Sequence, residues 1–239
     1  MIQNSHNYDH SRISIIIPTL NEANNITATI NSTELSTNVE VIVVDGGSDD
    51  DTAAIAQSLG ITVISSPPGR AIQMNKGAAI ASGEILLFLH ADTRLPPGFD
   101  QMIRTALQQP QTIAGAFALK IDAPDWGLRW VEWGVKLRSH LWQMPYGDQA
   151  IFVTKQAFYE IGNFTQIPIM EDFHLISQLK RISKITLIEV PVITSPRRWL
   201  KKGIFKTTLL NQIIIIAYLC GISPERIRKW YRQEKFSRI

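Results

Sequence analysis

This chain of 239 residues has little cysteine and no apolar run long enough for a membrane span. Its single cysteine, Cys220, excludes an internal disulfide and favours a reducing compartment. The first residues lack the basic segment and the apolar core of a signal peptide. Leu209–Ile222, an apolar stretch near the end, is shorter than the about 20 residues that a membrane-spanning helix needs. The sequence therefore predicts a cytoplasmic protein.

Two glycine-rich nucleotide motifs are also missing. No G-x-G-x-x-G follows the first expected strand, which argues against a Rossmann dinucleotide site, and no G-x-x-x-x-G-K-[ST] is present to form a P-loop. The hydrophobic content of 45% and the charged content of 19% are those of an ordinary folded protein. The length allows a sizeable core, in one large α/β domain or in two small ones.

Positive charge is concentrated near the end of the chain. From Arg197 onwards there are 11 lysines and arginines against 2 acids, which leaves 13 basic and 19 acidic residues in the rest. A basic segment of this kind contacts nucleic acid, an anionic membrane or a diphosphate, or is simply a solvated, positively charged last helix. The sequence alone leaves these alternatives open.

Apolar strands alternate with helices in the first half of the chain. The expected strands are Ile13–Ile17, Val39–Val44, Ile61–Ile64 and a buried strand within Glu84–Asp92 (EILLFLHAD). The expected helices are Asn21–Leu35, Ala53–Leu59 and Arg70–Ala81. This alternation predicts βαβ units in a parallel sheet, which binds ligands beyond the carboxyl ends of its strands.

Polar side chains follow each of these strands. They are Asn21 and Glu22, the acids from Asp45 to Asp50, Arg70, and finally His90 and Asp92. Acids at the first two strand ends could accept hydrogen bonds from a base and a ribose, while Arg70 opposes phosphate charge and Asp92 holds a divalent cation. The alternative is that these residues merely cap the strands.

The second half contains a further strand and an aromatic helix. In the expected strand Ile113–Ile121, Gly115 and Ala116 would leave room for a ligand to approach closely. Apolar side chains then recur at helical spacing, namely Trp126, Trp130, Trp133, Leu137 and Leu141. They indicate either a helix that packs its aromatic face on the core or an amphipathic helix near a lipid or aromatic acceptor.

Four segments together resemble the successive motifs of glycosyltransferase family 2. They are Ile13–Glu22 (ISIIIPTLNE), Val41–Thr52 (VIVVDGGSDDDT), Arg70–Gly83 (RAIQMNKGAAIASG) and Phe88–Thr93 (FLHADT). The resemblance runs to about Trp199. It implies an inverting, nucleotide-sugar-dependent transferase with the GT-A fold, an α/β architecture with a mostly parallel central sheet flanked by helices. A helical basic C-terminal tail would follow.

The resemblance also implies a donor site. Pro18, Asn21 and Glu22 resemble its first nucleotide-binding segment, and Asp45 resembles the acid that contacts the base, usually uracil, with Ser48 in the same loop. Arg70 and Asn75 resemble residues near the ribose and the diphosphate. Arg197 and Arg198 belong to a segment that resembles the one closing over the donor diphosphate, where the planar fork of arginine suits phosphate.

Two positions depart from the family pattern at the expected metal site. Asp92 resembles the last Asp of the D-x-D signature, which ligates Mn²⁺ or Mg²⁺. The position of the first Asp of that signature is occupied by His90. A neutral imidazole can bind Mn²⁺ or contact the ribose, although one negative charge is lost. Gly46 stands where the family commonly has a second acid.

Glu171 and Asp172 resemble the family's Glu-Asp pair, whose Asp is the catalytic base. An inverting transfer needs one carboxylate on the acceptor side to take the hydroxyl proton. Otherwise these acids only complement a helix N-terminus. Asp148 and Gln149 are expected to contact the acceptor or to form a polar turn, and Trp199 is assigned to the acceptor side.

The sequence thus predicts a GT-A domain over residues 13–202, with a nucleotide-binding half at 13–93 and an acceptor half at 94–202. Residues 1–12 form an extension, and residues 203–239 form a basic helical tail that packs on the domain or lies on the inner face of a membrane. The expected donor is a UDP-sugar, and a lipid-linked or lipophilic molecule is one candidate acceptor. Nucleic acid is not expected as a partner. A nucleotide-sugar-binding protein without turnover and a peripheral membrane scaffold are the alternatives.

Overall fold

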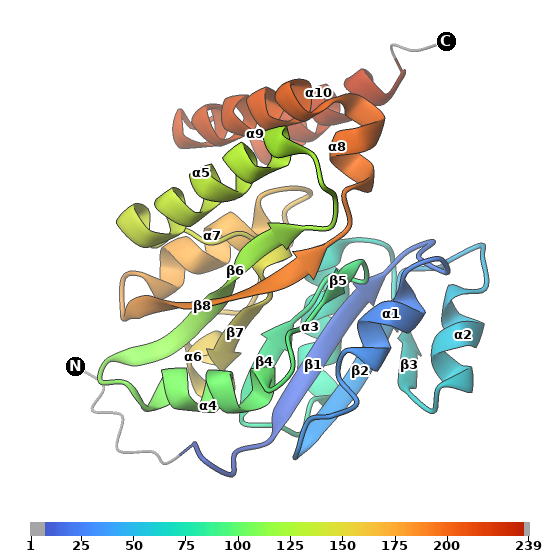
Figure 1. Ribbon diagram of the computed structural model, residues 1–239, viewed down its shortest axis with the longest axis vertical. Helices are drawn as coiled ribbons and strands as arrows, with labels where there is room; N and C mark the ends of the chain where they lie inside the picture. Colours follow the sequence, from blue (N-terminus) through green and yellow to red (C-terminus); the bar gives the residue numbers. More distant parts are fainter. Residues whose placement is uncertain (1–7, 237–239) are drawn as a thin grey trace.

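The computed structural model describes residues 8–236, and their side chains up to Tyr231 (Figure 1). It contains one eight-stranded mixed sheet in the order β3-β2-β1-β4-β7-β6-β8-β5, with helices on both faces. The predicted extension at residues 1–12 and the predicted tail therefore lie partly outside the described residues.

The first half of the chain forms the parallel part of the sheet. The strands β1 (Ile13–Thr19), β2 (Val39–Asp45), β3 (Thr62–Ser65) and β4 (Ile85–Phe88) run in the same direction, with β1 between β2 and β4. Every residue of β1 and β4 is buried, as expected of isoleucine- and leucine-rich strands covered on both faces. All four expected strands are confirmed.

Antiparallel pairs join the second half to the first. The later strands are β5 (Thr93–Arg94), β6 (Thr112–Ile121), β7 (Ile151–Thr154) and β8 (Lys184–Thr194). The pairs β4–β7, β7–β6 and β8–β5 are antiparallel, whereas β6–β8 is parallel. The strand β8 pairs with β6 along its length and with β5 only at Ile193 and Thr194.

The helices of the first half are α1 (Ile26–Asn31), α2 (Thr52–Ser58) and α3 (Arg70–Ile80). Those of the second half are α4 (Phe99–Gln108), α5 (Trp126–Trp142), the 3-10 turn η1 (Gly147–Gln149), α6 (Lys155–Glu160), α7 (Glu171–Leu179), α8 (Arg197–Lys202), α9 (Ile204–Leu219) and α10 (Pro224–Phe236).

The expected helix Asn21–Leu35 is wrong in its extent, because only Ile26–Asn31 is α-helical. Asn21 has a left-handed backbone with φ of 56°, and its side-chain oxygen accepts a hydrogen bond from the N–H of Asp49. At the other end, the hydroxyl of Thr33 donates to the carbonyl of Ile30. Local side-chain hydrogen bonds therefore compete with helix formation at both ends.

Each face of the sheet has its own core. Ile15 of β1 packs on the face covered by α1, α2, α4 and α5, whereas Ile16 packs on the face covered by α3, α6 and α7. Side chains alternate along a strand, so one run of isoleucines serves both layers. The result is a three-layer α/β arrangement with its polar loops at the carboxyl ends of the central strands (Figure 1).

The structure corrects the expectation that Gly115 and Ala116 make room for a ligand. Both residues are buried in β6. A Cβ atom at Gly115 would lie 2.4 Å from the ring of Phe152 and 2.4 Å from the carbonyl oxygen of Thr186. The small side chains therefore allow the sheet itself to pack, and no space is left for a ligand there.

The aromatic stripe of α5 is also not in the core. Trp126, Trp130 and Trp133 are 68%, 65% and 59% exposed. The helix instead turns Leu128 toward the sheet, where it is fully buried, and Gly127 lies against Ile204 of α9. Of the two sequence interpretations of this helix, packing of the tryptophan face on the core is therefore wrong.

The helices α8, α9 and α10 lie together at the end of the molecule where α5 also lies (Figure 1). A third apolar cluster joins α9 and α10 to α7 and contains Met170, Phe173, Leu210, Ile214, Ala217 and Ile227. In the part of the chain that the structure describes, no helix combines the length and apolarity needed to cross a bilayer.

Candidate active site

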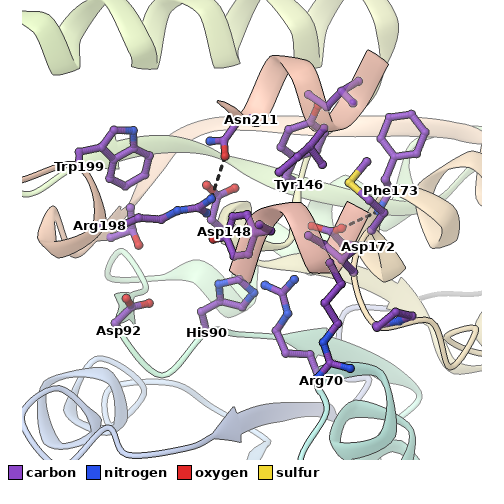
Figure 2. Close-up of a pocket in the computed structure, with 18 of the residues that line it drawn as sticks. Arg70, His90, Asp92, Tyr146, Asp148, Asp172, Phe173, Arg198, Trp199 and Asn211 are labelled. Carbon is purple, nitrogen blue, oxygen red and sulfur yellow. Dashed lines mark hydrogen bonds between the residues drawn. The ribbon is translucent and has the colours of Figure 1, made fainter. Parts of the chain in front are cut away.

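A pocket of about 570 Å³ opens beyond the end of β4, between the sheet and the C-terminal helices (Figure 2). Both halves of the chain contribute to its wall. Its polar and charged lining includes Arg70, His90, Asp92, Tyr146, Asp148, Asp172, Thr194, Ser195, Arg198, Asn211, Arg228 and Tyr231. Its apolar lining includes Pro168, Ile169, Met170, Phe173, Trp199, Ile214 and Ile215.

His90 and Asp92 reach this pocket from a tight turn between β4 and β5. The N–H of Thr93 donates to the carbonyl of His90 at 3.1 Å, so the chain is no longer extended here. Burial, and then the nearby positive charge of Arg70, lower the pKa of His90. The imidazole is therefore neutral near pH 7, because its ordinary pKa is about 6.5.

Arg197 links the ends of β1 and β4. Its Nη2 lies 2.8 Å from Oε2 of Glu22 and 3.1 Å from Oδ2 of Asp92. The arginine side chain is about half exposed, at 48%. Two carboxylates that would otherwise repel each other at the edge of the sheet thus share one cation.

The N-terminus of α7 supplies the two adjacent acids in different environments. Glu171 is buried, and its Oε1 lies 2.6 Å from Nε of Arg70. Burial raises the pKa of Glu171, against the opposing influence of Arg70. Partial desolvation disfavours the charge of Arg70, but the carboxylates of Glu171 and Asp172 outweigh this effect and raise the pKa of the guanidinium.

Asp172 faces the pocket with its orientation fixed by the backbone. Its Oδ2 accepts a hydrogen bond from the N–H of Gly147 at 2.7 Å, and its Oδ1 accepts one from the N–H of Phe173 at 2.8 Å. A Cβ atom at Gly147 would lie 3.0 Å from Nε2 of His90 and 3.1 Å from Oδ2 of Asp172. Glycine at this position therefore allows the His90 imidazole and the Asp172 carboxylate to lie close to the backbone of the η1 turn.

Asp148 and Tyr146 lie near the middle of the labelled group in Figure 2. Oδ1 of Asp148 is buried without a hydrogen-bond partner in the described part of the chain. Burial raises the pKa of Asp148, while Arg138 and His90 oppose the shift. Burial also raises the pKa of Tyr146 to about 12. The guanidinium of Arg138 stacks on the Tyr146 ring, 3.5 Å from its centroid.

Gln149 has a local role in the structure. It is fully buried, and its Nε2 donates to the carbonyl of Phe117 at 2.9 Å. Its Oε1 accepts hydrogen bonds from Tyr146, Ser139 and Arg138. Gln149 thus fixes the η1 turn that presents Asp148, and it does not line the pocket.

The loop after β2 is organised around Asp45, which is buried. The carboxylate accepts hydrogen bonds from the N–H groups of Gly47 and Ser48 and from the Ser48 hydroxyl. The N–H of Asn21 in turn donates to the Ser48 hydroxyl at 2.9 Å. These residues and Pro18, which is buried in β1, were predicted from the sequence to bind the donor, but they do not line the described pocket.

Asn75, also predicted as a donor-binding residue, lies outside the pocket. Its side-chain amide forms two hydrogen bonds with the backbone of Phe164, at 2.8 and 3.0 Å. The amide ties α3 to the loop after α6 and is not among the residues that line the pocket.

Sequence reasoning missed the part of the pocket that comes from the tail. Asn211, Ile214 and Ile215 of α9 and Arg228 and Tyr231 of α10 all line it. Nη2 of Arg198 donates to Oδ1 of Asn211 at 2.8 Å, which links α8 to α9. A polar residue within the apolar run of α9 was the available signal, since such a residue needs a partner when it is not in water.

The metal-binding groups near Asp92 suit a metal ion that is also coordinated by a substrate, rather than one held by the protein alone. Among the described residues, no group of three or more His, Cys, Asp or Glu side chains is arranged to hold a metal ion. Mg²⁺ in phosphate-binding sites is often held by one or two carboxylates together with substrate phosphates and water. Asp92 and His90, both in the pocket wall, fit an ion that takes its other ligands from a bound diphosphate.

The family model described as Glycosyl transferase family 2 matches residues 14–207. A PGL/p-HBAD biosynthesis glycosyltransferase of Mycobacterium bovis (strain BCG) is 42% identical over 165 residues, which is 63% of this chain and 62% of that protein. The glycosyltransferase AglE of Haloferax volcanii is 37% identical over 91 residues, 34% of this chain and 30% of AglE. The chain thus spans less than two thirds of the length of these relatives.

Solved structures show the same fold. The mannosyltransferase PcManGT from Pyrobaculum calidifontis, in complex with GDP-Man and Mn²⁺, has a TM-score of 0.62 at 20% identity, over 77% of this chain and 56% of its own. TarS 1-349 of S. aureus, in complex with UDP-GlcNAc, has a TM-score of 0.62 at 17% identity, over 77% and 58%. The GT-A fold predicted from the motifs is confirmed, and the match over residues 14–207 shows that the chain belongs to glycosyl transferase family 2.

Proposed function

We propose that this protein transfers a sugar with inversion from a nucleotide-diphosphate donor to an acceptor hydroxyl, with Asp172 as the base. The observation that carries the proposal is the Asp172 carboxylate, held at the pocket by the N–H groups of Gly147 and Phe173. In the view of Figure 2, Asp92 and Asp172 lie on either side of His90. We propose that the donor diphosphate lies on the Asp92 side of this cavity and the acceptor hydroxyl on the Asp172 side.

The proposed reaction is a single displacement. The acceptor oxygen forms a bond to the anomeric carbon, the bond from that carbon to the diphosphate oxygen breaks, and the hydroxyl proton passes to the Asp172 carboxylate. Asp172 suits this role because two backbone donors fix its orientation while lone pairs remain for the acceptor hydroxyl. Glu171 is occupied by Arg70 and is therefore proposed as a positioning residue.

Cationic groups are proposed to stabilise the leaving diphosphate. Arg70 and Arg198 line the pocket, and Arg197 is within 3.1 Å of Asp92 at the donor edge. Arginine forks bind phosphate oxygens in pairs, which supports this assignment. A divalent cation, Mn²⁺ or Mg²⁺, held by Asp92 and His90 would supply further positive charge to the diphosphate when bound.

A UDP-sugar is the proposed donor. Asp45, in the loop after β2, is proposed to contact the base, with Ser48, Asn21, Glu22 and Pro18 nearby. The solved relatives hold GDP-Man in one case and UDP-GlcNAc in the other, so likeness of fold does not select the base. A binding screen of UDP, GDP and their sugars tests the choice directly.

The acceptor is proposed to be lipophilic. Ile169, Met170, Phe173, Ile214 and Ile215 give the pocket an apolar side next to Asp172. Asp148, whose Oδ1 is buried without a partner in the described residues, is proposed to accept a hydrogen bond from a sugar or acceptor hydroxyl. We further propose that the protein acts in the cytoplasm and meets its acceptor at the inner face of a membrane through its tail.

One observation favours a second candidate, a nucleotide-sugar-binding protein without turnover. His90 occupies the position of the family's first metal-binding acid, and Asp92 is already paired with Arg197. A chain with too few metal ligands would bind the donor without cleaving it. Turnover therefore separates the two candidates.

The test measures nucleotide diphosphate released from UDP-sugars and GDP-sugars in the presence of Mn²⁺, with donor affinity measured separately by calorimetry. Asp172→Asn is expected to lower kcat by about a hundredfold to ten-thousandfold while donor affinity is retained, because only the proton acceptor is lost. Asp122→Asn, an equal change at an exposed position, serves as the matched control. Wild-type turnover in the Asp172 variant would rule out this base, and donor binding without any turnover would favour the second candidate.

A further inference from the structure

We propose that the exposed apolar stripes of α5 and α9 form one docking surface for an anionic lipid bilayer. Tryptophan side chains and not only the basic tail would then anchor the protein. The inference deepens the proposed lipophilic acceptor, but it is tested by lipid binding and not by turnover. The two proposals can therefore fail separately.

The stripe on α5 consists of Trp126, Trp130, Trp133, Leu137 and Leu141. Their spacing of three or four residues places them along one face of the helix. All five are exposed, and Leu141 is 66% exposed. The opposite face packs on the core, so the stripe is not needed to hold the helix in place.

The stripe on α9 consists of Phe205, Leu209, Ile213 and Ile216, again at spacings of three or four residues. Phe205, Leu209 and Ile216 are 78%, 63% and 60% exposed. The two helices meet near their first turns, since a Cβ atom at Gly127 would lie 3.3 Å from Cδ1 of Ile204. Clusters of exposed apolar side chains on this scale mark interaction sites in soluble proteins.

Charge at the same end of the molecule favours a lipid surface as the occupant. Exposed basic side chains on α8, α9 and α10 include Arg197, Arg198, Lys201, Lys206, Arg226, Arg228 and Lys229. Glu225 is the one acid between Arg197 and Tyr231. A second copy of the chain, related by two-fold symmetry, would bring these like charges together, whereas anionic headgroups would neutralise them. Tryptophan is enriched at the boundary between headgroups and acyl chains, which agrees with the same occupant.

The helix α9 connects this surface to the pocket. One side of α9 carries the exposed stripe, while Ile214 and Ile215 line the pocket and Leu210 and Ala217 are buried against the helices around it. A bilayer on the stripe would therefore lie one helix away from the apolar side of the pocket. A lipid acceptor could enter the pocket without leaving the membrane surface completely.

The experiment measures co-sedimentation of the full chain with vesicles made from equal parts of phosphatidylglycerol and phosphatidylcholine. The wild type is expected to bind these vesicles, and to bind less as salt is raised or when phosphatidylglycerol is omitted. The double variant Trp130→Ser, Trp133→Ser is expected to lower the partition coefficient by about tenfold or more, because each apolar side chain contributes roughly that factor when buried.

A matched control replaces two exposed apolar side chains that lie outside the proposed docking surface. Leu35 and Ile80 are 91% and 50% exposed and lie outside the two stripes. The variant Leu35→Ser, Ile80→Ser is expected to bind vesicles as the wild type does. Thermal unfolding followed by circular dichroism checks that all variants are folded.

Three results would overturn the inference. The first is that the wild type does not sediment with anionic vesicles, and the second is that the tryptophan variant and the control bind vesicles equally. The third is that the wild type is a dimer in lipid-free solution while the tryptophan variant is a monomer. The third result would identify the stripes as an interface between copies of the chain. None of these outcomes depends on nucleotide release.

Discussion

At the scale of single residues, Arg197 joins the loops that follow β1 and β4. It pairs with Glu22 after β1 and with Asp92 after β4. The Arg197 side chain is about half exposed, whereas those of Glu22 and Asp92 are 22% and 27% exposed. Because solvent screens the arginine, these ion pairs contribute only about 0–1 kcal/mol to the free energy of unfolding. Its main effect is expected on ligand binding.

Arg197→Ala is expected to raise KM for the nucleotide-sugar by about tenfold, because one bidentate cation is removed from the proposed diphosphate site. The melting temperature should change little. Steady-state kinetics and differential scanning calorimetry measure the two quantities. Arg129→Ala, which removes an arginine paired with Glu132 on α5, is the control and should leave KM unchanged. An unchanged KM in the Arg197 variant would exclude it from the donor site.

Asp100 and Arg104 form a buried ion pair within α4, with Oδ2 and Nη1 2.8 Å apart. Burial alone would raise the pKa of Asp100, but hydrogen bonds from Arg104 and Thr37 outweigh it and lower this pKa. A carboxyl whose pKa is lower in the folded state stabilises the fold above its unfolded pKa of about 4. This contribution is lost as the pH falls through the folded pKa.

Asp100→Asn is therefore expected to lower the free energy of unfolding by about 3–5 kcal/mol at pH 7, since Arg104 stays buried without its partner charge. The difference in unfolding free energy from the wild type should shrink as the pH falls below about 4, because the wild-type Asp100 is then protonated and no longer stabilises the fold through its charge. Urea unfolding across this pH range measures both effects. The exposed Asp122→Asn change, next to Arg94, should cost less than about 1 kcal/mol. A cost that is independent of pH would contradict the linkage.

At the scale of elements, β6 shows why some small residues are required. Gly115→Ala is expected to lower the free energy of unfolding by about 1–3 kcal/mol, because its Cβ atom would overlap the Phe152 ring and the β8 backbone. Gly134→Ala in α5 meets nothing within 4 Å and is expected to stabilise the protein by about 0.5–1 kcal/mol. Urea unfolding of both variants decides the point, and equal effects of the same sign would show that sheet packing is not the reason for Gly115.

The helix α5 shows how far a pattern of apolar residues can be interpreted. Its spacing predicted the helix and one apolar stripe, and both are confirmed. Amphipathicity does not tell whether the stripe faces the core or a partner, because both are apolar. That choice depends on how the helix packs on its neighbours. In α5, Leu128 and the residues on the same face pack against the sheet, so the tryptophan face points outward.

At the scale of the whole molecule, the tail packs as part of the folded protein. Ile227 of α10 is fully buried in the cluster that contains Phe173 of α7. Ile227→Ala is expected to lower the free energy of unfolding by about 2–5 kcal/mol, with a single cooperative transition. Calorimetry and urea unfolding measure this, and Leu219→Ala, at a position 67% exposed, is the control with little expected change. A separate early transition of the tail would contradict a shared core.

Much of the fold was determined by the sequence. Runs of β-branched and leucine residues in β1, β2 and β4 favour strands covered on both faces, and their alternation with helices leads to a parallel sheet with polar ends. The four motifs then identified the family, and the pocket contains Arg70, His90, Asp92, Asp148 and Asp172, all of which were predicted as site residues. Local patterns sufficed where burial and backbone geometry act within one element.

Only the tertiary structure decided which polar residues face the pocket and which support the fold. Asn75 and Gln149 look as polar in the sequence as Asp148, yet their amides are used by the backbone of Phe164 and Phe117. The contribution of α9 and α10 to the pocket was likewise undetermined, because it rests on contacts between residues far apart in the chain. Hydrogen-bond partners and helix docking depend on the packed arrangement as a whole, which no local pattern specifies.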